Sequence, residues 1–336
     1  MTKIPDTVID NYLKQEKANI EETSISLQDI EDLGSKDVIK EMYGDIKKYR
    51  QMLQEKITFI NDDLSKVIPF TRENLYLICA FTGSGKSTIA ANISLPLYKQ
   101  QKKTLIISNE EPKQDVLMRI ACIELGLNFN GYKKGYMQPT DIAAAMKLFP
   151  AISRYVKVID VNYKDGFTTK VECVKAALEQ VQQSEEFSCA MIDYFQLIKH
   201  SLKNPQASTY EVLNDFRMWM GRYIKASRVP IVLLAQLHSI TKRGKDIDGR
   251  IKHCPEVSET ASVILEVQPD FEKKMSSIVV VKDRFGYQGK KLEMGYDNGK
   301  FVPYTQEFQQ KVEQDQLAIL ANTIQDKDDE DDEDDD

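Results

Sequence analysis

The amino-acid sequence predicts an α/β protein in which a mostly parallel β-sheet is flanked by helices. Three observations lead to this prediction. From about residue 57 onward, short apolar runs alternate with amphipathic helical stretches; a glycine-rich turn joins the first run to a helix; and a later apolar run ends in Asp193. Strands that alternate with helices form right-handed βαβ units, and such units build parallel sheets.

Seven apolar runs are the predicted strands, and helical patterns separate the first five of them. The strands are Leu75–Ala80, Thr104–Ser108, Val156–Val161, Cys189–Asp193, Ile231–Ala235, Val263–Val267 and Ile278–Val281. The helices are Ser87–Lys99, Lys113–Leu125, Thr168–Gln183 and Thr209–Ala226. The last two strands, with Lys291–Met294 and Lys300–Pro303, follow one another without helices and predict an antiparallel extension.

Four segments are expected along the chain. Residues 1–56 form a helical N-terminal arm or linker, since Ser35–Lys56 has apolar positions at helical spacing but too few for a core of its own. Residues 57–305 form the main domain, and residues 306–325 form an amphipathic C-terminal helix. Residues 326–336 hold ten acids and one lysine and are expected to be disordered, because dense like charge cannot bury a core.

The net charge of −7 is concentrated in this acidic tail, whose own charge is −9. The rest of the chain carries +2 (−7 minus −9), which leaves nucleic acid open as a partner. No apolar run approaches the ~18–20 residues that span a bilayer, and Met1–Asp10 lacks the features of a signal peptide. We therefore expect a cytoplasmic protein without membrane association. Five scattered cysteines without a CxxC pair favour reduced thiols and no structural zinc.

The segment Ala80–Ser87 reads Ala-Phe-Thr-Gly-Ser-Gly-Lys-Ser between an apolar run and a helical pattern. This is the context of a Walker A loop, whose glycines bring backbone N–H groups close to phosphates at a helix N-terminus. Lys86 would reach the β- and γ-phosphates of ATP or another NTP, and Ser87 would bind Mg²⁺. The residues predicted to hold the nucleotide are Ala80, Thr82, Gly83, Ser84, Gly85, Lys86, Ser87 and Thr88. The alternative, a glycine-rich turn with a chance Lys-Ser, leaves the flanking strand and helix unexplained.

Two acidic positions complete the predicted chemistry. Asp193 ends an apolar strand, as a Walker B carboxylate does, and would hold Mg²⁺ together with Ser87. Glu110 follows the strand after the loop helix and is the predicted base for the attacking water, because the γ-phosphate lies at this end of a parallel sheet. Glu111 is farther from the strand end. In the alternative interpretation, both glutamates only cap the helix that begins at Pro112.

Together these segments resemble the motor domain of DnaB-like replicative DNA helicases, which has a RecA-like P-loop fold. Ser108–Arg119 is similar to that family's Ser-x-Glu strand end and the helix after it. Ile192–Leu197 reads Ile-Asp-Tyr-Phe-Gln-Leu and is similar to the family's Walker B segment Ile-Asp-Tyr-Leu-Gln-Leu. The resemblance covers residues 57–305 and is absent before residue 57, where members of the family usually carry a collar domain and a linker helix.

The resemblance also implies roles for three later residues. Leu234–Leu237 is similar to the family's Ser-Gln-Leu segment, so Gln236 would sense the γ-phosphate. Val281–Gly286 is similar to its Lys-x-Arg-Asn-Gly segment, so Arg284 would be an arginine finger for the next subunit and Lys282 its companion. A finger supplied in trans implies a homo-oligomer, which we expect to be a hexamer. Alternatively, both residues are ordinary exposed charges at a strand end.

Two loops at the carboxyl ends of predicted strands are candidates for contact with single-stranded DNA. The loop Ser239–Cys254 holds five basic residues against two aspartates, and such loops suit phosphate contact without sequence reading. The predicted DNA contacts are Lys242, Arg243, Lys245, Arg250 and Lys252. The loop His200–Thr209 is shorter and has one lysine, Lys203. In the resembled family the corresponding loops line the channel of the ring; the alternative is that both are solvated charged loops.

These features lead to one predicted function and two alternatives. The predicted function is an ATP-dependent replicative DNA helicase that translocates on single-stranded DNA as a ring oligomer. The alternatives are a RecA-like strand-exchange ATPase and a non-motor switch ATPase in a protein assembly. The N-terminal arm or the acidic tail would contact a primase, a loader, a polymerase or a single-strand-binding protein, unless the tail serves only solubility. The short N-terminal segment suggests a phage replication protein that acts in the host cytoplasm.

Overall fold

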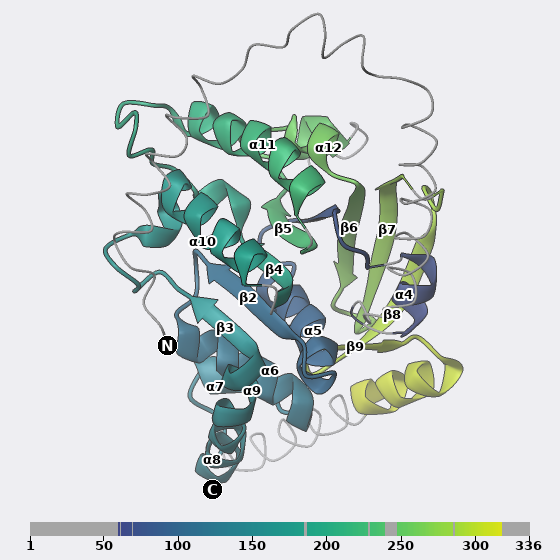
Figure 1. Cartoon of the computed structure of the whole chain (residues 1–336). Coiled ribbons are helices and arrows are strands. Elements are labelled where there is room, and N and C mark those ends of the chain that lie inside the picture. The colour runs from purple at the N-terminus through teal and green to yellow at the C-terminus, as the bar shows by residue number, and fades with distance from the viewer. Residues whose placement is uncertain are drawn as a thin grey trace, which may run out of the picture.

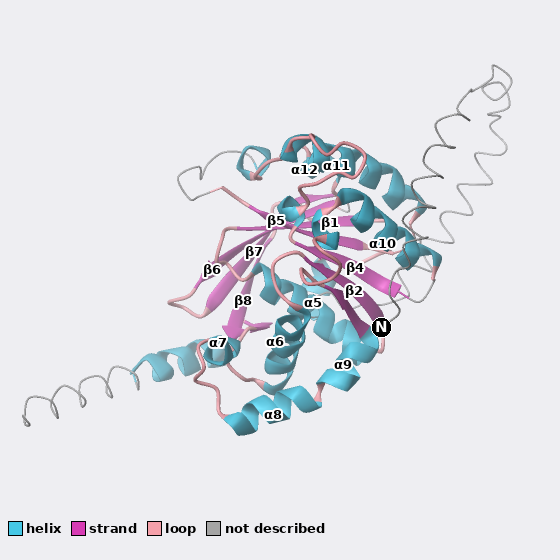
Figure 2. Cartoon of the chain, turned by 90° about the vertical axis from the view of Figure 1, so that its left-hand side faces the viewer, coloured by secondary structure: helices cyan, strands magenta, loops and turns pink. Residues whose placement is uncertain are grey.

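The structure, a computed structural model, describes residues 60, 62–68, 70–184, 187–227, 229–238, 247–284 and 286–317. In this part of the chain a nine-stranded sheet runs in the order β3-β2-β4-β5-β1-β6-β7-β8-β9. Helices cover both faces of the sheet (Figures 1 and 2). The predicted α/β fold with a mostly parallel sheet is confirmed.

The strands agree closely with the apolar runs of the sequence. They are β1 Leu75–Ala80, β2 Lys103–Ser108, β3 Val156–Ile159, β4 Phe187–Asp193, β5 Ile231–Gln236, β6 Val263–Asp270, β7 Met275–Asp283, β8 Lys291–Asp297 and β9 Lys300–Pro303. The pairs from β3 to β6 along the sheet are parallel, and β7, β8 and β9 continue it as antiparallel strands. The antiparallel extension therefore starts one strand later than predicted. The connection from β5 to β6, which contains a short helix at Val257–Thr260, returns the chain to the same end of the sheet, so that β6 runs parallel to β1.

The helices include five that the sequence did not predict. They are α4 Asp62–Val67, α5 Lys86–Lys99, α6 Lys113–Leu125, α7 Phe129–Lys133, α8 Pro139–Lys147, α9 Phe149–Tyr155, α10 Val171–Gln183, α11 Thr209–Ala226 and α12 Val257–Thr260. Short 3-10 turns lie at Phe167–Thr169, Phe195–Leu197 and Ile247–Arg250. The unpredicted helices are α4, α7, α8, α9 and α12, all of them short; α7, α8 and α9 pack beside α6 (Figure 2). The predicted helix at Thr168 begins instead as a 3-10 turn, and α10 follows it.

The central strands are buried on both faces, which explains their continuous apolar runs. All six residues of β1 are buried. Tyr76 and Ile78 of β1 belong to a core cluster with residues of α5 and α6, while Leu77 and Cys79 belong to a second cluster with residues of α10 and α11. With β1, β2, β4 and β5 all parallel, their carboxyl ends meet at one edge of the sheet. This edge carries the candidate site.

Several predictions from the sequence lie outside the described residues. They are the arm at 1–56, the acidic tail at 326–336, and the loop residues Lys242, Arg243 and Lys245. Residues 306–317 are helical, within the predicted C-terminal helix. None of the helices in the described ranges is long and apolar enough to cross a membrane. All five cysteines are described and buried, and none forms a disulfide.

Candidate nucleotide-binding site

The loop between β1 and α5 is shaped to receive an anion. Gly83 and Gly85 have φ angles of 77° and 80°, in the left-handed region that strains other residues. Gly85 is the N-cap of α5; no side chain caps this helix and its first turn holds no acid. Its first backbone N–H groups therefore keep their hydrogen-bonding capacity, and together with the helix dipole they favour a phosphate.

Lys86 is the first residue of α5, and its side chain is almost fully buried. Its ammonium group donates to the carbonyl of Phe81 (3.3 Å) and lies 5.4 Å from the ring centroid of Tyr194. Burial lowers the pKa of Lys86, whereas the charges of Asp193 and Glu110 raise it. A buried ammonium group near two carboxylates and a glycine-rich helix start is well placed to bind a phosphate.

Asp193 and Ser87 come together from β4 and α5, as the sequence predicted for a Mg²⁺ site. The Ser87 hydroxyl donates a hydrogen bond to the Asp193 carboxylate, which is 3% exposed. Burial raises the pKa of Asp193 to about 6; the charges of Glu111 and Glu110 add to this rise, and the Ser87 hydrogen bond opposes it. Asp193 Oδ1 has no hydrogen-bond partner among the described residues. A buried carboxylate oxygen beside a hydroxyl fits Mg²⁺, which prefers oxygen ligands and retains part of its water shell.

The two glutamates after β2 have different surroundings. Glu110 is exposed, and its charge acts on both Lys86 and Asp193. Glu111 instead forms an ion pair with Arg119 of α6, and Arg119 also donates to Thr88 Oγ1 (3.1 Å). The Glu111 carboxylate is therefore engaged with Arg119, while the charge of the exposed Glu110 acts on both Lys86 and Asp193. This difference favours Glu110 as the base.

Gln236 ends β5, directly beside Ala80 in the register of β1 and β5. Its side-chain amide donates to Thr82 Oγ1 in the P-loop. The family resemblance implied a γ-phosphate sensor at Gln236, and this side chain does contact the phosphate loop. Its backbone is held by Gln196, a residue to which the sequence assigned no role.

Lys282 and Arg284 lie near the amino-terminal ends of the parallel strands, whereas the P-loop of the same chain lies at their carboxyl ends. Asp283 pairs with Val263 at the start of β6, whereas Ala80 pairs with Val267. At about 3.3 Å per residue, these two levels are roughly 13 Å apart along the strands. Lys282 donates to the carbonyls of Ser258 (2.8 Å) and Glu259 (3.2 Å), and Arg284 is exposed. Neither residue is placed to act on its own P-loop.

Two residues of the predicted DNA-binding set, Arg250 and Lys252, are described, and neither is fully exposed. Arg250 forms a bidentate ion pair with Glu266 of β6 (2.7 and 2.6 Å), and the two side chains are only 12% and 4% exposed. Lys252 is half-buried, and its positive charge lowers the pKa of Lys86. The expectation that Arg250 faces DNA does not agree with this geometry: its guanidinium anchors the end of the loop to the sheet.

Three residues that hold the site together received no role from the sequence. Arg119 connects Thr88 to Glu111 and stacks on Phe129, 4.0 Å from the ring centroid. Asn109 joins β2 to the end of β4, since its N–H donates to the Asp193 carbonyl (2.6 Å) and its amide to that of Tyr194 (3.1 Å). Gln196 is the third. Each is a polar residue within or beside an apolar stretch, which was the available signal.

A hollow of about 210 Å³ opens beside the P-loop helix, and Thr88, Arg119, Phe129 and Tyr296 contribute to its lining. It lies on the side of α5 that faces β8 and β9. Its walls combine aromatic rings, a guanidinium group and the amide of Asn298.

Comparison with known proteins identifies the family. The family model described as "DnaB-like helicase C terminal domain" matches residues 18–300. The match starts within the predicted arm, so the resemblance begins before residue 57, where the sequence motifs had placed its start. Replicative DNA helicase DnaB of Geobacillus stearothermophilus is 23% identical over 251 residues, which cover 71% of this chain and 54% of that protein. The chain thus spans about half the length of this relative.

Two solved structures have the same fold. One of them, described as an ATPase domain, has a TM-score of 0.65 at 16% identity, over 80% of this chain and 99% of its own. A DnaB-like replicative helicase, whose structure is described with its interactions with primase, has a TM-score of 0.64 at 16% identity, over 88% of this chain and 76% of its own. With a RecA-like ATPase fold and a family match over most of its length, this chain belongs to the DnaB-like helicase family of NTP-hydrolysing enzymes.

Proposed function

We propose that this protein is an ATP-dependent DNA helicase that translocates on single-stranded DNA as a ring oligomer and unwinds the duplex ahead of it. The observation that carries the proposal is the hydrogen bond between Ser87, in the first turn of α5, and Asp193, with Lys86 close to both. This arrangement offers an ammonium group to a phosphate and two oxygen ligands to Mg²⁺. Family membership supplies the link to DNA.

Each residue of the site has a distinct role in hydrolysis. The backbone of Gly83–Ser87 and the Lys86 ammonium hold the β- and γ-phosphates. Ser87 and Asp193 hold Mg²⁺, which when bound offsets phosphate charge. Glu110 accepts a proton from the attacking water or orients it. The Gln236 amide contacts Thr82 of the P-loop, and a γ-phosphate would offer this amide a further acceptor.

The hollow beside Thr88 suits the nucleoside part of the substrate. It continues from the P-loop helix, and the guanidinium of Arg119 and the ring of Tyr296 offer flat faces for a base. Triphosphates with different bases would share the phosphate contacts and differ only here. ATP or another NTP therefore satisfies the geometry.

The position of Arg284 supports a ring. Since it lies at the edge opposite its own P-loop, it can complete a site only in a neighbouring copy. A guanidinium supplied in trans stabilises the charge of the transferring phosphoryl group. Lys282 would support it from the same strand. In a closed ring each copy gives and receives one such finger, and a hexamer is the expected size.

For DNA, we propose contacts from Lys242, Arg243 and Lys245, with the loop at residues 199–208 as a second contact. Arg250 is reassigned to the loop anchor. Lys252 lies between the two functions, close enough to Lys86 to affect its pKa. Primase, loader, polymerase or single-strand-binding protein remain candidate partners of the arm or the acidic tail. The cytoplasm of a phage host is the proposed location.

The test is ATP hydrolysis with and without single-stranded DNA, with Lys86→Ala as the inactive control. Strong stimulation by DNA that is lost in the control supports the motor, and a fork-unwinding assay then tests the helicase. Hydrolysis indifferent to DNA would favour the non-motor switch ATPase. Pairing of homologous strands without unwinding would favour the recombinase.

A further inference from the structure

The loop at residues 199–208, which joins β4 to α11, is fastened at both of its ends. At its start, the N–H groups of Lys199 and His200 donate to the carbonyl of Thr169 (2.9 and 3.1 Å), and the N–H of Val171 donates to the His200 carbonyl (2.9 Å). At its end, Ser208 and Glu211 form a capping box at the N-terminus of α11. Such anchors fix where a loop leaves and returns, but not the shape of its middle.

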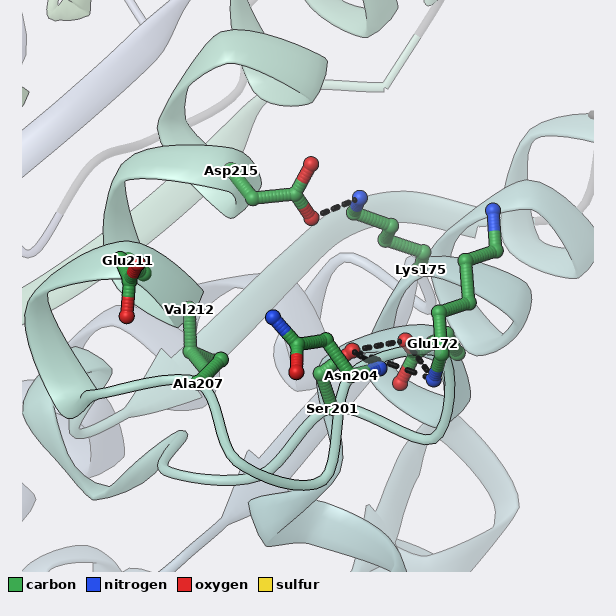
Figure 3. Close-up of a pocket in the computed structure, with 9 residues that line it drawn as sticks. Glu172, Lys175, Ser201, Asn204, Ala207, Glu211, Val212 and Asp215 are labelled. Atoms are coloured by element: carbon green, nitrogen blue, oxygen red, sulfur yellow. Dashed lines mark hydrogen bonds and ion pairs between the residues drawn. The ribbon is translucent and has the colours of Figure 1, made fainter.

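Glu172, in the first turn of α10, fixes the middle of the loop. Its carboxylate accepts hydrogen bonds from the Ser201 hydroxyl (2.6 Å), the Leu202 N–H (2.8 Å) and the Lys203 N–H (3.2 Å). Figure 3 shows Glu172 facing the loop at Ser201. Ser201 Oγ in turn accepts from the N–H groups of Lys203 (3.2 Å) and Asn204 (3.1 Å). Three successive backbone N–H groups are thus satisfied by one carboxylate and one hydroxyl.

The carboxylate of Glu172 is used for this purpose alone in the described contacts. Glu172 is 2% exposed, and its hydrogen-bond partners are all in the loop. A buried carboxylate is costly unless its charge is well satisfied, and backbone N–H groups satisfy it well. The nearby ammonium of Lys175 is directed to Asp215 (2.7 Å) and not to the loop (Figure 3).

The result is a loop whose middle is held in one shape beside α10 and α11. Between the loop and these helices lies a hollow of about 280 Å³, to which Lys203, Ala207 and Asp215 contribute. Leu202 is 44% exposed, and Lys203, at the rim of the hollow, is exposed. An exposed apolar side chain next to a lysine, on backbone of fixed shape, offers one nonpolar contact for a base or sugar and one charge for a phosphate.

We propose that Glu172 is a positioning residue that holds Leu202 and Lys203 in the geometry needed for single-stranded DNA. This inference rests on the proposed function. Glu172 does not touch DNA itself; it acts by holding the loop that does. An ordered loop binds with a smaller loss of conformational entropy than a loop that orders on contact.

The experiment uses the full chain and compares the wild type with Glu172→Gln, Ser201→Ala and Glu179→Gln. The first variant turns one acceptor oxygen into an N–H₂ group facing backbone donors. The second removes the loop's side of the contact and leaves α10 untouched, which guards against a folding defect. Glu179→Gln is the matched control, since it makes the same chemical change on the same helix, where the carboxylate contacts Trp219.

Two measurements follow the loop and its use. Trypsin cleavage after Lys203, identified by the new N-terminus at Asn204, reports how well the loop is held; we expect a rise of roughly fivefold or more in Glu172→Gln and Ser201→Ala. Affinity for a fluorescent oligo-dT should fall about tenfold in both, with DNA-free ATP hydrolysis near wild type and Tm lowered by a few degrees at most, because Glu172→Gln leaves a buried donor unsatisfied. In a double-mutant cycle, Lys203→Ala should weaken DNA binding less in the Glu172→Gln background than in the wild type, because the loop is already misplaced.

The outcomes separate this inference from the function on which it rests. If wild-type protein does not bind oligo-dT, the proposed function fails, and no variant is needed to see it. If the wild type binds but Glu172→Gln binds equally well, or if Lys203→Ala has the same effect in both backgrounds, the positioning role is overturned. Faster cleavage with unchanged DNA affinity also overturns it, since the loop would then be held for some other purpose.

Discussion

Gln196 and Gln236 hold each other through a reciprocal pair of hydrogen bonds. The N–H of Gln236 donates to Gln196 Oε1 (3.0 Å), and Gln196 Nε2 donates to the Gln236 carbonyl (3.1 Å). The same Nε2 donates to the Lys252 carbonyl (3.3 Å). The buried side chain of Gln196, just after β4, thus holds the end of β5 and the backbone of Lys252 together. The Gln236 side chain extends the connection to Thr82 in the P-loop.

Changing Gln196 to Glu should destabilise the protein while preserving the shape of the side chain. Glu retains an acceptor for the Gln236 N–H but loses both donors, and it places a charge near two carbonyl oxygens. We expect the free energy of unfolding to fall by about 1–3 kcal/mol, the usual result of leaving buried polar groups unsatisfied. Urea denaturation measures this. Gln180→Glu, on the exposed face of α10, is the control, and an equal effect in the two variants would contradict the role of the Gln196 bonds.

Asp193→Asn should slow hydrolysis strongly without harming the fold. Removal of the predicted Mg²⁺ ligand should lower kcat by roughly 10²–10³, similar to the loss of other transition-state contacts. The nucleotide-free protein should melt at the same temperature or higher, because burial disfavours the Asp193 carboxylate and raises its pKa to about 6. Phosphate release at varied Mg²⁺ and thermal melting measure the two effects. Wild-type hydrolysis with unchanged Mg²⁺ dependence would remove Asp193 from the site.

Arg284→Ala and Lys86→Ala should each be inactive alone and recover activity when mixed. In a mixed ring, a Lys86→Ala copy can supply its intact Arg284 to the intact P-loop of an Arg284→Ala neighbour. Loss of the finger alone should lower kcat by about 10³ or more. The measurement is ATP hydrolysis against the mixing ratio, after subunit exchange. Activity that never exceeds that of the separate variants would argue against a site shared between copies.

The sequence predicted the central sheet and the phosphate site well because these depend on local patterns. The run Leu75–Ala80 is apolar at every position because β1 is buried on both faces, and the glycines after it leave few conformations for the loop. The α7–α9 region was not predicted, since these helices are short and their stability depends on packing against α6 rather than on periodicity. The parallel pairing of β6 is a long-range property that no local pattern encodes.

The site residues differ in the same way. Lys86, Ser87 and Asp193 have fixed positions within motifs, so their meeting could be predicted. The partners of Arg119, Gln196 and Glu172 come from other elements of the fold, and charge or apolarity in the sequence does not identify them. Arg250 illustrates the converse: five basic residues in one loop indicate DNA contact, but Glu266, the residue that binds one of them, lies on β6.

The stability of the protein should depend on pH through Glu179. Burial raises the pKa of this carboxyl to about 7, while the Trp219 hydrogen bond and the charge of Lys175 oppose the rise. Between about pH 4.5 and 7 the folded state binds more protons than the unfolded state, so the contribution of Glu179 to the unfolding free energy falls as pH rises and is constant above 7. Glu179→Gln should therefore raise Tm by a few degrees more at pH 8 than at pH 5. The same gain at both pH values would show that Glu179 titrates normally.

Arg250→Ala and Lys242→Ala each remove one positive charge, but the first should reduce stability and the second should reduce DNA affinity. Arg250→Ala leaves Glu266 buried without its partner, and breaking such a pair lowers the unfolding free energy by about 3–5 kcal/mol. Lys242→Ala should leave stability unchanged and weaken DNA binding. Replacing Lys242, Arg243 and Lys245 together should reduce the slope of log affinity against log salt by roughly 2, at about 0.7 per phosphate contact on a single strand.

Urea denaturation and oligo-dT titration at several salt concentrations measure the two effects on the same variants. A further variant, Arg250→Met with Glu266→Met, removes both charges and should recover much of the lost stability, since no unpaired charge remains buried. If Arg250→Ala is instead as stable as the wild type and reduces the salt slope as Lys242→Ala does, then its guanidinium leaves Glu266 to bind DNA, and the original assignment of Arg250 as a DNA contact stands.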